Sequence, residues 1–498
     1  MRIKNGKSLA VIVIVFLVTI IFCRLCNTSA DIDLWGYMSF GKLFWDTGSF
    51  PYYDPFSYTA KGQPWVYHEW LTGVLLYRVF DLFGETGLQI LRYLVGFSTA
   101  GLVYATARLR GADMLSSAFG LLYASIAFGI GYSPVRAQIF TYFLFMLTVY
   151  ILESAQKKER WAYLIFLIPI HLLWCNLHGG FIAGIGLVAI YTFGQMLLRR
   201  PFSPYLFALL GSVISTLINP YGISYWSKIY TAIAMNRPFV AEWWSLFTAI
   251  KMGYAINNHL LFILIIALSI LALAWYRWKN IIDILVLVVT ALLGFAANRH
   301  EVFFFLSFGA YLPIVFSPYT NRLTSDTKFQ NFIARLNWKR SLVIISLLVV
   351  FPIYSISGVN PLRITLSADP AAKGFYYPLG AIKYIKEHNM TGNILTDFEW
   401  GEYVIWQLYP KCLVGMDGRY ETIYSKDVFK SYIEFYFAFN NWQSFLRDYP
   451  HDMILIKKSA PVYSILRKQE SWREVYSDLG SALFVQNKWK YPFVKPLL

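Results

Sequence analysis

Residues 8–24 read SLAVIVIVFLVTIIFCR, an almost unbroken run of Val, Ile, Leu and Phe that follows Arg2, Lys4 and Lys7. Cleaved signal peptides and membrane anchors share this layout of basic residues before an apolar run. The run is longer than the usual core of a signal peptide, and small residues are poorly placed for cleavage. We therefore expect a retained membrane-spanning helix whose N-terminus is cytoplasmic.

The composition of the whole chain indicates the same class of protein. Of 498 residues, 57% are hydrophobic and 14% are charged, whereas soluble proteins carry about 25% charged residues. Lys and Arg outnumber Asp and Glu by 44 to 28, which gives a net charge of +16. In a membrane protein such an excess collects on cytoplasmic loops, so we predict no nucleic-acid partner. The four cysteines are too few and too scattered for a disulfide framework.

Ten more apolar runs have the composition of membrane-spanning helices, which need roughly 17–25 mainly apolar residues. The run from Trp70 to Phe83 is shorter and suits a re-entrant or membrane-surface helix better than a span. The sequence thus predicts an α-helical polytopic membrane protein with about 11 transmembrane helices. After the first, their expected ranges are 88–107, 113–131, 139–153, 161–175, 180–198, 203–218, 259–276, 281–297, 302–317 and 341–357.

The distribution of basic residues supports this count and sets the orientation. With Trp70–Phe83 outside the membrane, the expected cytoplasmic loops hold 17 Lys and Arg residues and the expected outside loops hold 7. Basic residues favour the cytoplasmic side. We therefore predict a multi-pass protein of the inner or plasma membrane, with a cytoplasmic N-terminus and an extracytoplasmic C-terminal domain.

From about residue 358 the pattern changes to short hydrophobic runs of strand length that alternate with helical stretches such as Lys426–Phe439. Such alternation predicts a small α/β domain. We therefore divide the chain into a transmembrane module, 1–357, with a first extracytoplasmic loop at 27–69, and an extracytoplasmic α/β domain, 358–498. The four strand-like runs are Asn393–Thr396, Cys412–Met416, Asp452–Ile456 and Ser481–Gln486.

Every expected outside loop contains a compact group of polar and small residues. Ionisable groups beside hydrocarbon are costly and usually mark a functional cavity, so we expect these groups to converge on one site. They are Asp31-Ile-Asp33, His68-Glu69-Trp70, Ser133 to Gln138 with Arg136, Asn176 to Gly180 with His178, Asn219 to Gly222, Glu242-Trp-Trp, and Asn298-Arg299-His300-Glu301.

Each group also has a structural explanation. Asp31 and Asp33 could only solvate a loop, and His68-Glu69 could cap the short helix that follows. Arg136 could snorkel at the interface and His178 could serve helix packing, while Asn219 to Gly222 has the composition of a turn. A purely structural role is least expected for the three consecutive ionisable residues Arg299 to Glu301.

The stretch from Asp31 to Leu71 resembles the first extracytoplasmic loop of the GT-C superfamily, to which protein O-mannosyltransferases and lipid A aminoarabinose transferases belong. Members carry an acidic residue after the first helix, an aromatic residue four positions later and a Gly about fifteen positions later, as do Asp33, Tyr37 and Gly48 here. A closer resemblance, to uncharacterised bacterial members with a C-terminal extracytoplasmic domain, extends to Gly401–Trp406 and Met416–Arg419. Asp417–Arg419 either forms a turn with an Asp–Arg pair or contributes to acceptor binding.

The resemblance implies a membrane glycosyltransferase that moves a sugar from a polyprenyl-phosphate-linked donor to an extracytoplasmic glycan, lipid or protein. Asp33 would be the general base, with Asp31 and Glu69 as further catalytic residues. Many members have an acidic residue in the second outside loop, where this chain has Arg136 and Gln138. Arg136 and Arg299 would bind phosphate through their planar guanidinium groups. The other expected substrate-binding residues are His68, Gln138, His178, His300 and Glu301.

Other functions also fit the sequence. A divalent metal ion is a candidate cofactor. His68, Glu69, His178, His300 and Glu301 are N or O ligands of the right kind, but the sequence does not place them within coordination distance of one another. A non-catalytic assembly or binding protein for cell-envelope polysaccharide is the main alternative function, and a transporter is a weaker one. Transporters usually show paired halves with broken helices near the membrane midplane, whereas here the polar groups lie at one expected face and no internal repeat is found. The polyprenyl-phosphate donor and membrane lipid are the expected partners.

Overall fold

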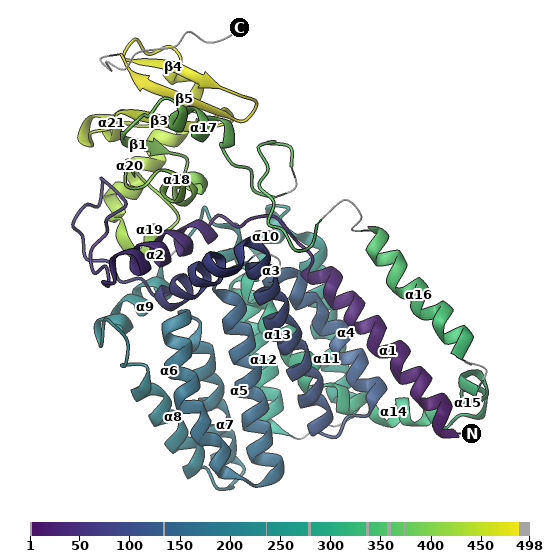
Figure 1. Cartoon of the computed structure of the whole chain (residues 1–498). Helices are drawn as coiled ribbons and strands as arrows, with labels where there is room; N and C mark the ends of the chain where they lie inside the picture. Colours follow the sequence, from purple (N-terminus) through teal and green to yellow (C-terminus); the bar gives the residue numbers. More distant parts are fainter. Residues whose placement is uncertain are drawn as a thin grey trace. The chain divides into compact units, whose positions relative to one another are not determined.

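The computed structural model divides into two compact units (Figure 1). Unit 1 comprises Met1–Thr28, Glu85–Tyr225 and Ile233–Arg363, and unit 2 comprises Ser29–Gly84, Trp226–Ala232 and Ile364–Leu498. The expected domain boundary between 357 and 358 lies outside the described residues. These are residues 2–132, 135–235, 237–276, 280–334, 338–355, 360–372 and 374–487.

Unit 1 is a bundle of helices that run side by side (Figure 1). Long apolar sequences favour helices in a membrane because a helix satisfies its own backbone hydrogen bonds. Its helices are α1 (Arg2–Leu25), the second part of α3 (Trp70–Leu109), α4 (Met114–Gly131), α5 (Gln138–Lys158), α6 (Leu167–Leu177), α7 (Phe181–Leu197), α8 (Ser203–Ser215), α10 (Leu246–Lys251), α11 (Ile256–Trp275), α12 (Ile281–Ala296), α13 (Glu301–Tyr311), α14 (Pro313–Ser325), α15 (Thr327–Ala334) and α16 (Trp338–Ser355). Helix α9 (Ser224–Ala234) contributes residues to both units.

Five described helices are long and apolar enough to cross a membrane: Ser8–Leu25, Trp70–Leu109, Met114–Gly131, Gln138–Lys158 and Ile256–Trp275. Asn298–Tyr311 and Pro313–Ser325, bent by 44°, make a sixth if they form one span. The other apolar helices, Trp161–Leu177, Phe181–Leu197, Ser203–Ser215 and Ile281–Ala296, are only 10–17 residues long. The chain therefore has several membrane-capable helices, and the predicted count of eleven is not confirmed.

Small residues allow close contact between α4 and α13, the helix that carries Glu301. A Cβ atom added to Gly309 would lie 2.7 Å from the Cβ of Ala124, and one added to Gly120 would lie 2.9 Å from the carbonyl oxygen of Gly309. Membrane helices commonly pack through such small residues, because lipid offers no hydrophobic driving force. The position of α13, and thus of the site at its N-terminus, is fixed by this contact.

A buried ion cluster joins three segments of unit 1. The guanidinium group of Arg110 pairs with Glu153 of α5 at 2.7 Å and with Asp283 of α12, and it lies over the ring of Tyr311. Tyr191 of α7 donates a hydrogen bond to Glu153. Arg110 is one of the basic residues expected in a cytoplasmic loop, yet it is buried and paired.

Unit 2 is built on a five-stranded sheet with the order β2-β1-β3-β5-β4. Strands β2 (Cys412–Val414), β1 (Gly392–Thr396) and β3 (Met453–Lys457) are parallel, and β5 (Ser481–Gln486) and β4 (Trp472–Ser477) continue antiparallel. The remaining helices of this unit are α17 (Leu379–Glu387), α18 (Gly401–Leu408), α19 (Tyr420–Ile423), α20 (Lys426–Phe437), α21 (Ser444–Asp448) and α22 (Tyr463–Leu466). The predicted α/β fold of this region is confirmed.

The segment Ser29–Gly84, which includes most of the first loop expected at 27–69, is part of unit 2, and several of its residues contact the C-terminal region. Ser57 pairs with Val414 at the edge of β2, where the amide of Tyr58 donates to the carbonyl of Val414 at 3.1 Å. Helix α2 (Leu34–Thr47) packs against α18. Gly48 ends α2 in the left-handed conformation, with φ 64°, which glycine adopts readily. This segment and the C-terminal region thus belong to one compact unit.

Helix α3 is interrupted at Gly84, where φ is 61° and ψ is −158°. The boundary between the units falls between Gly84 and Glu85. The short segment Trp70–Phe83 is therefore distinct from the apolar helix that follows it, which agrees with the sequence analysis.

Candidate functional site

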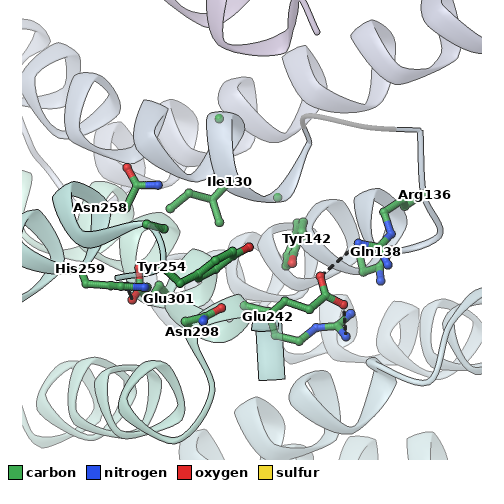
Figure 2. A pocket seen from close by; sticks show the side chains of 14 residues that line it. Ile130, Arg136, Gln138, Tyr142, Glu242, Tyr254, Asn258, His259, Asn298 and Glu301 are labelled. Carbon is green, nitrogen blue, oxygen red and sulfur yellow. Dashed lines mark hydrogen bonds and ion pairs between the residues drawn. The ribbon is translucent and has the colours of Figure 1, made fainter. Parts of the chain in front are cut away.

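Some of the residues expected to bind substrate line a cavity of about 280 Å³ in unit 1 (Figure 2). Four predicted residues, Arg136, Gln138, Arg299 and Glu301, lie in its wall. They come from two segments: Arg136 precedes α5 and Gln138 is its first residue, while Arg299 lies in the short 3-10 helix Asn298–His300 and Glu301 begins α13 directly after it. The other lining residues are Gly129, Ile130, Gly131, Tyr142, Glu242, Tyr254, Ala255, Asn258, His259 and Asn298.

Two arginines bind one carboxylate in this cavity. Arg136 donates to Oε2 of Glu242 at 3.1 Å, and Arg299 donates to Oε1 at 3.0 Å (Figure 2). Burial alone would raise the pKa of Glu242, but the two guanidinium groups outweigh it and lower the pKa to about 2. Glu242 is therefore ionised at neutral pH, and the three side chains carry a net positive charge.

An aromatic ring supports the arginines. The Trp243 ring lies 4.1 Å from the guanidinium carbon of Arg237 and 4.5 Å from that of Arg299. Such cation–π contacts stabilise arginine where little water is available. Asn298 holds this segment in place, because its side chain donates to the carbonyl of Ala241 at 2.9 Å. The two neighbours of Glu242 in the sequence, Ala241 and Trp243, are thus both held by contacts.

A second polar pair lies in the same cavity. Nδ1 of His259 lies 2.6 Å from Oε1 of Glu301, and both side chains are buried. His300 contacts the ring of Trp243, with centroids 5.8 Å apart. His178 is hydrogen-bonded to Thr141 at 2.8 Å and is not among the residues that line the cavity.

The four predicted residues of the first loop lie in unit 2, as two pairs of sequence neighbours. Asp33 is the residue before α2, and its amide donates to Oδ1 of Asp31 at 3.1 Å. Asp31 is buried, whereas Asp33 is half-buried. His68 and Glu69 form a pair at 3.9 Å just before α3.

A carboxyl group from the C-terminal region lies beside Asp33. Oε2 of Glu402, in α18, accepts a hydrogen bond from the amide of Gly36 in the first turn of α2 at 2.9 Å. A Cβ atom added to Gly418 would lie 2.8 Å from Oε1 of Glu402 and 3.6 Å from Oδ1 of Asp33. Burial, followed by the charges of Asp33 and Asp417, raises the pKa of Glu402 well above its usual range.

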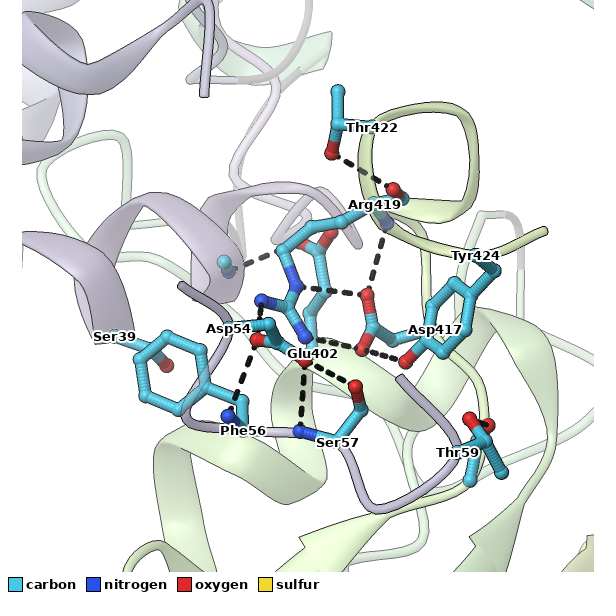
Figure 3. A network of polar contacts seen from close by, with 12 residues as sticks. Ser39, Asp54, Phe56, Ser57, Thr59, Glu402, Asp417, Arg419, Thr422 and Tyr424 are labelled. Atoms are coloured by element: carbon cyan, nitrogen blue, oxygen red, sulfur yellow. Dashed lines mark hydrogen bonds and ion pairs between the residues drawn. The ribbon is translucent and has the colours of Figure 1, made fainter. Parts of the chain in front are cut away.

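Arg419 is the centre of a buried network that joins the first loop to the C-terminal region (Figure 3). It forms two side-chain hydrogen bonds with Asp417, at 2.9 and 2.6 Å, and one with Asp54 at 2.8 Å. Tyr424 also donates to Asp417, at 2.7 Å. The Asp–Arg pair expected at Asp417–Arg419 is therefore present, and it binds Asp54 as well.

Metal binding is not assigned to particular residues. Within the described ranges, no group of three or more His, Cys, Asp or Glu side chains is arranged to hold a metal ion. We therefore name no metal ligands and assign no chemical step to a metal.

The charged residues of the loops were predictable from the sequence, but several of their partners were not. Glu242 was recognised as a polar loop residue without a role, and Arg237 was not singled out. His259 was not predicted to belong to the site because it lies inside an apolar helix, α11. The only signal for it in the sequence is that an ionisable residue is unusual there. Glu402 was noted only as part of a resemblance, because nothing in its local sequence indicates a contact with a residue 366 positions away.

Comparison with solved structures identifies the fold. The chain is similar to ArnT from Cupriavidus metallidurans bound to undecaprenyl phosphate, with a TM-score of 0.52 and 13% identity over 96% of this chain and 97% of that chain. The apo structure of ArnT gives a TM-score of 0.51 with the same identity and coverage. An oligosaccharyltransferase from Archaeoglobus fulgidus, in complex with Zn and sulfate, matches with a TM-score of 0.48 and 11% identity over 97% of this chain and 74% of that chain.

Comparisons of sequence alone give no match. No family model matches this chain. No curated protein matches it either. Over nearly its whole length, the chain nevertheless has the fold of ArnT.

Proposed function

We propose that this protein is a membrane glycosyltransferase that moves a sugar from a polyprenyl-phosphate-linked donor to an acceptor outside the cytoplasm. The fold of ArnT, which has been solved with undecaprenyl phosphate bound, supports a lipid-phosphate donor. The apolar helices of unit 1 supply surfaces for a long lipid chain.

The observation that carries the proposal is the pair Arg136 and Arg299 on either side of Glu242. Each arginine binds a different oxygen of the same carboxylate, at 3.1 and 3.0 Å. Guanidinium groups bind phosphate oxygens with the same geometry. A phosphate bound here would take the place of the Glu242 carboxylate, and the arginines would stabilise the negative charge that the leaving phosphate gains.

Asp33 is the general base in this proposal. The acceptor hydroxyl oxygen forms a bond to the anomeric carbon of the sugar, the bond from that carbon to the phosphate oxygen breaks, and the hydroxyl proton passes to the Asp33 carboxylate. Asp33 is half-buried, while Asp31 is buried and accepts the amide hydrogen bond of Asp33. Asp31 therefore orients the loop, and Asp33 is the more accessible of the two.

The donor site is tested by binding of undecaprenyl phosphate to the purified full-length protein. We expect Arg136→Ala and Arg299→Ala each to weaken binding by roughly 10- to 100-fold, since a hydrogen bond to a charged group contributes about 1.5–3 kcal/mol. Arg200→Ala, at an exposed position of unit 1, is the control and should bind normally. Unchanged affinity in both cavity variants would contradict the phosphate site.

The activity itself is tested in a strain that lacks the gene. Mass spectrometry should reveal a glycan that is missing from this strain and restored by the wild-type protein. Normal donor binding without any transferred sugar would instead favour a binding or assembly protein.

A further inference from the structure

Two sequence motifs of the C-terminal region, Gly401–Trp406 and Met416–Arg419, have no part in the function proposed so far, yet both reach Asp33. We propose that Glu402 is a positioning residue for Asp33, so that the C-terminal region supplies the second carboxyl group of the catalytic site. Glu402 has this role within the function proposed above, in which Asp33 is the base.

Glu402 performs the capping that Asp33 would otherwise perform. An Asp at the N-cap usually accepts a hydrogen bond from the second or third amide of its helix. Asp33 occupies the N-cap of α2 and makes no side-chain capping bond. The third amide, that of Gly36, donates to Glu402 at 2.9 Å instead. The carboxylate of Asp33 is thus not committed to capping its own helix.

Two glycines give Glu402 access to this position. A Cβ atom on Gly36 would lie 2.3 Å from Oε2 of Glu402, and one on Gly418 would lie 2.8 Å from Oε1. Both distances are too short for a side chain. The same Cβ on Gly418 would lie 3.6 Å from Oδ1 of Asp33. The carboxyl groups of Asp33 and Glu402 therefore lie against the same glycine, one contributed by each end of the chain.

The charges around Glu402 decide which carboxyl group ionises. Asp33 faces Glu402 from the N-cap of α2. Asp417 and Arg419 face it from the turn after β2, and Tyr67 faces it from the first loop. Adjacent carboxyl groups in a buried site do not readily ionise together. Glu402 is the buried member, and burial together with the charges of Asp33 and Asp417 raises its pKa, so it keeps its proton to a higher pH than an ordinary glutamate. While it does so, the pair carries at most one negative charge, and a single base faces the acceptor.

The experiment compares Glu402→Gln, Glu402→Ala and the exposed control Glu387→Gln in the full-length protein. Gln keeps the oxygen that binds Gly36 and is neutral like the protonated Glu, so we expect transfer at pH 7 within about threefold of wild type, well short of the loss of a general base. Ala removes that oxygen and leaves α2 misplaced, which should slow transfer by up to about 100-fold. The control should behave as wild type.

The pH profile separates this role from a merely structural one. As the pH rises, wild-type Glu402 ionises, and its negative charge repels the neighbouring carboxylate of Asp33 and displaces it, so transfer should fall. Glu402→Gln should keep its rate there. Coincident pH profiles for wild type and Glu402→Gln, or wild-type rates in a folded Glu402→Ala protein, would overturn the inference.

Unfolding measurements test the pairing without any activity. A carboxyl group whose pKa is raised by folding stabilises the protein fully below its unfolded pKa, and this stability is lost as the pH rises through the folded pKa. The unfolding midpoint of the wild type should therefore fall with rising pH more steeply than that of Glu402→Gln. Asp33→Asn should also reduce this slope, because it removes the charge that raises the pKa of Glu402.

The transfer assay and the unfolding measurement test the two proposals independently. A wild-type protein that transfers no sugar but shows these slopes would refute the glycosyltransferase and support the pairing. An Asp33→Asn protein with the wild-type slope would refute the pairing, whatever the activity.

Discussion

Single residues carry the chemistry that we propose. Asp33 is half-buried beside Asp31 and near Glu402, and Arg136 and Arg299 hold the carboxylate of Glu242. Each of these side chains is ionisable and is buried or half-buried, where electrostatic interactions are stronger than in bulk water. Substitutions that change charge but not shape are therefore the most informative.

Asp33→Asn should fold normally and lose transfer, because an amide cannot accept the proton of the acceptor hydroxyl. Loss of a general base lowers a rate by about 10²–10⁴-fold. Transfer is measured with the purified protein and a lipid-linked sugar. Asp46→Asn is the control, since Asp46 lies at the other end of α2 in an exposed pair with Lys42. More than about a tenth of the wild-type rate in Asp33→Asn would be too much for the loss of a general base.

Arg419→Met should destabilise unit 2 strongly. Arg419 is the buried partner of Asp54 and Asp417, and its removal leaves two carboxylates uncompensated. Breaking a buried ion pair from one side costs about 3–5 kcal/mol. Limited proteolysis and thermal unfolding of the full-length protein measure this loss. Arg447→Met removes an exposed pair with Asp448 and should change stability by less than about 1 kcal/mol. Equal stability of the two variants would contradict the structural role of Arg419.

At the scale of elements, helix α2 links the base to the C-terminal region. Its first turn begins at Asp33 and is capped by Glu402, and its face packs on α18. The helix ends at Gly48. Any substitution that separates α2 from α18 should therefore displace Asp33 and slow transfer, even where it leaves every ionisable residue unchanged.

Gly36→Ala tests this link. The added Cβ would lie 2.3 Å from Oε2 of Glu402, so the carboxyl group must move away from the amide that it caps. Overpacking of this kind costs about 1–3 kcal/mol, and we expect lower stability together with slower transfer. Lys42→Ala, which leaves the same alanine side chain at an exposed position of the same helix, should change neither stability nor transfer. Full activity in Gly36→Ala would contradict the coupling.

Several elements of the C-terminal sheet were predictable and one was not. The expected strand Ser481–Gln486 coincides with β5, and those at 393–396, 412–416 and 452–456 match β1, β2 and β3 within two residues at each end. These strands are hydrophobic because the sheet buries them. Strand β4 was missed because Arg473, Glu474 and Ser477 interrupt its apolar residues and only Trp472 is buried.

For the whole molecule, topology is the property that the sequence predicts and that still needs a test. The prediction rests on 17 basic residues in the expected cytoplasmic loops against 7 outside. Alkaline phosphatase is active only outside the cytoplasm. A fusion after Lys158 should therefore be inactive, and one after Asn360 active. The opposite pattern would refute the eleven-helix arrangement.

The sites could be predicted in part. Arg136, Gln138, Arg299 and Glu301 were expected to share a site, and they line one cavity. Loop charges are recognisable because such groups are unusual beside apolar helices. The contact of Glu402 with α2 joins residues 366 positions apart. Helical or strand periodicity describes only near neighbours, so the sequence pattern could not place the C-terminal region beside Asp33.

The division of unit 2 between two distant parts of the chain has a consequence for biosynthesis. Gly84 and Ile364 are 280 positions apart, and ribosomes add about 5–20 residues per second. The first loop must therefore wait on the order of tens of seconds after its own synthesis before its partner strands exist. During that time Asp54 lacks Arg419, α2 lacks its cap, and apolar surface is exposed to chaperones and proteases. In a prematurely terminated chain the partner strands are never made and the apolar surface of the first loop stays exposed. We therefore expect such chains to be degraded.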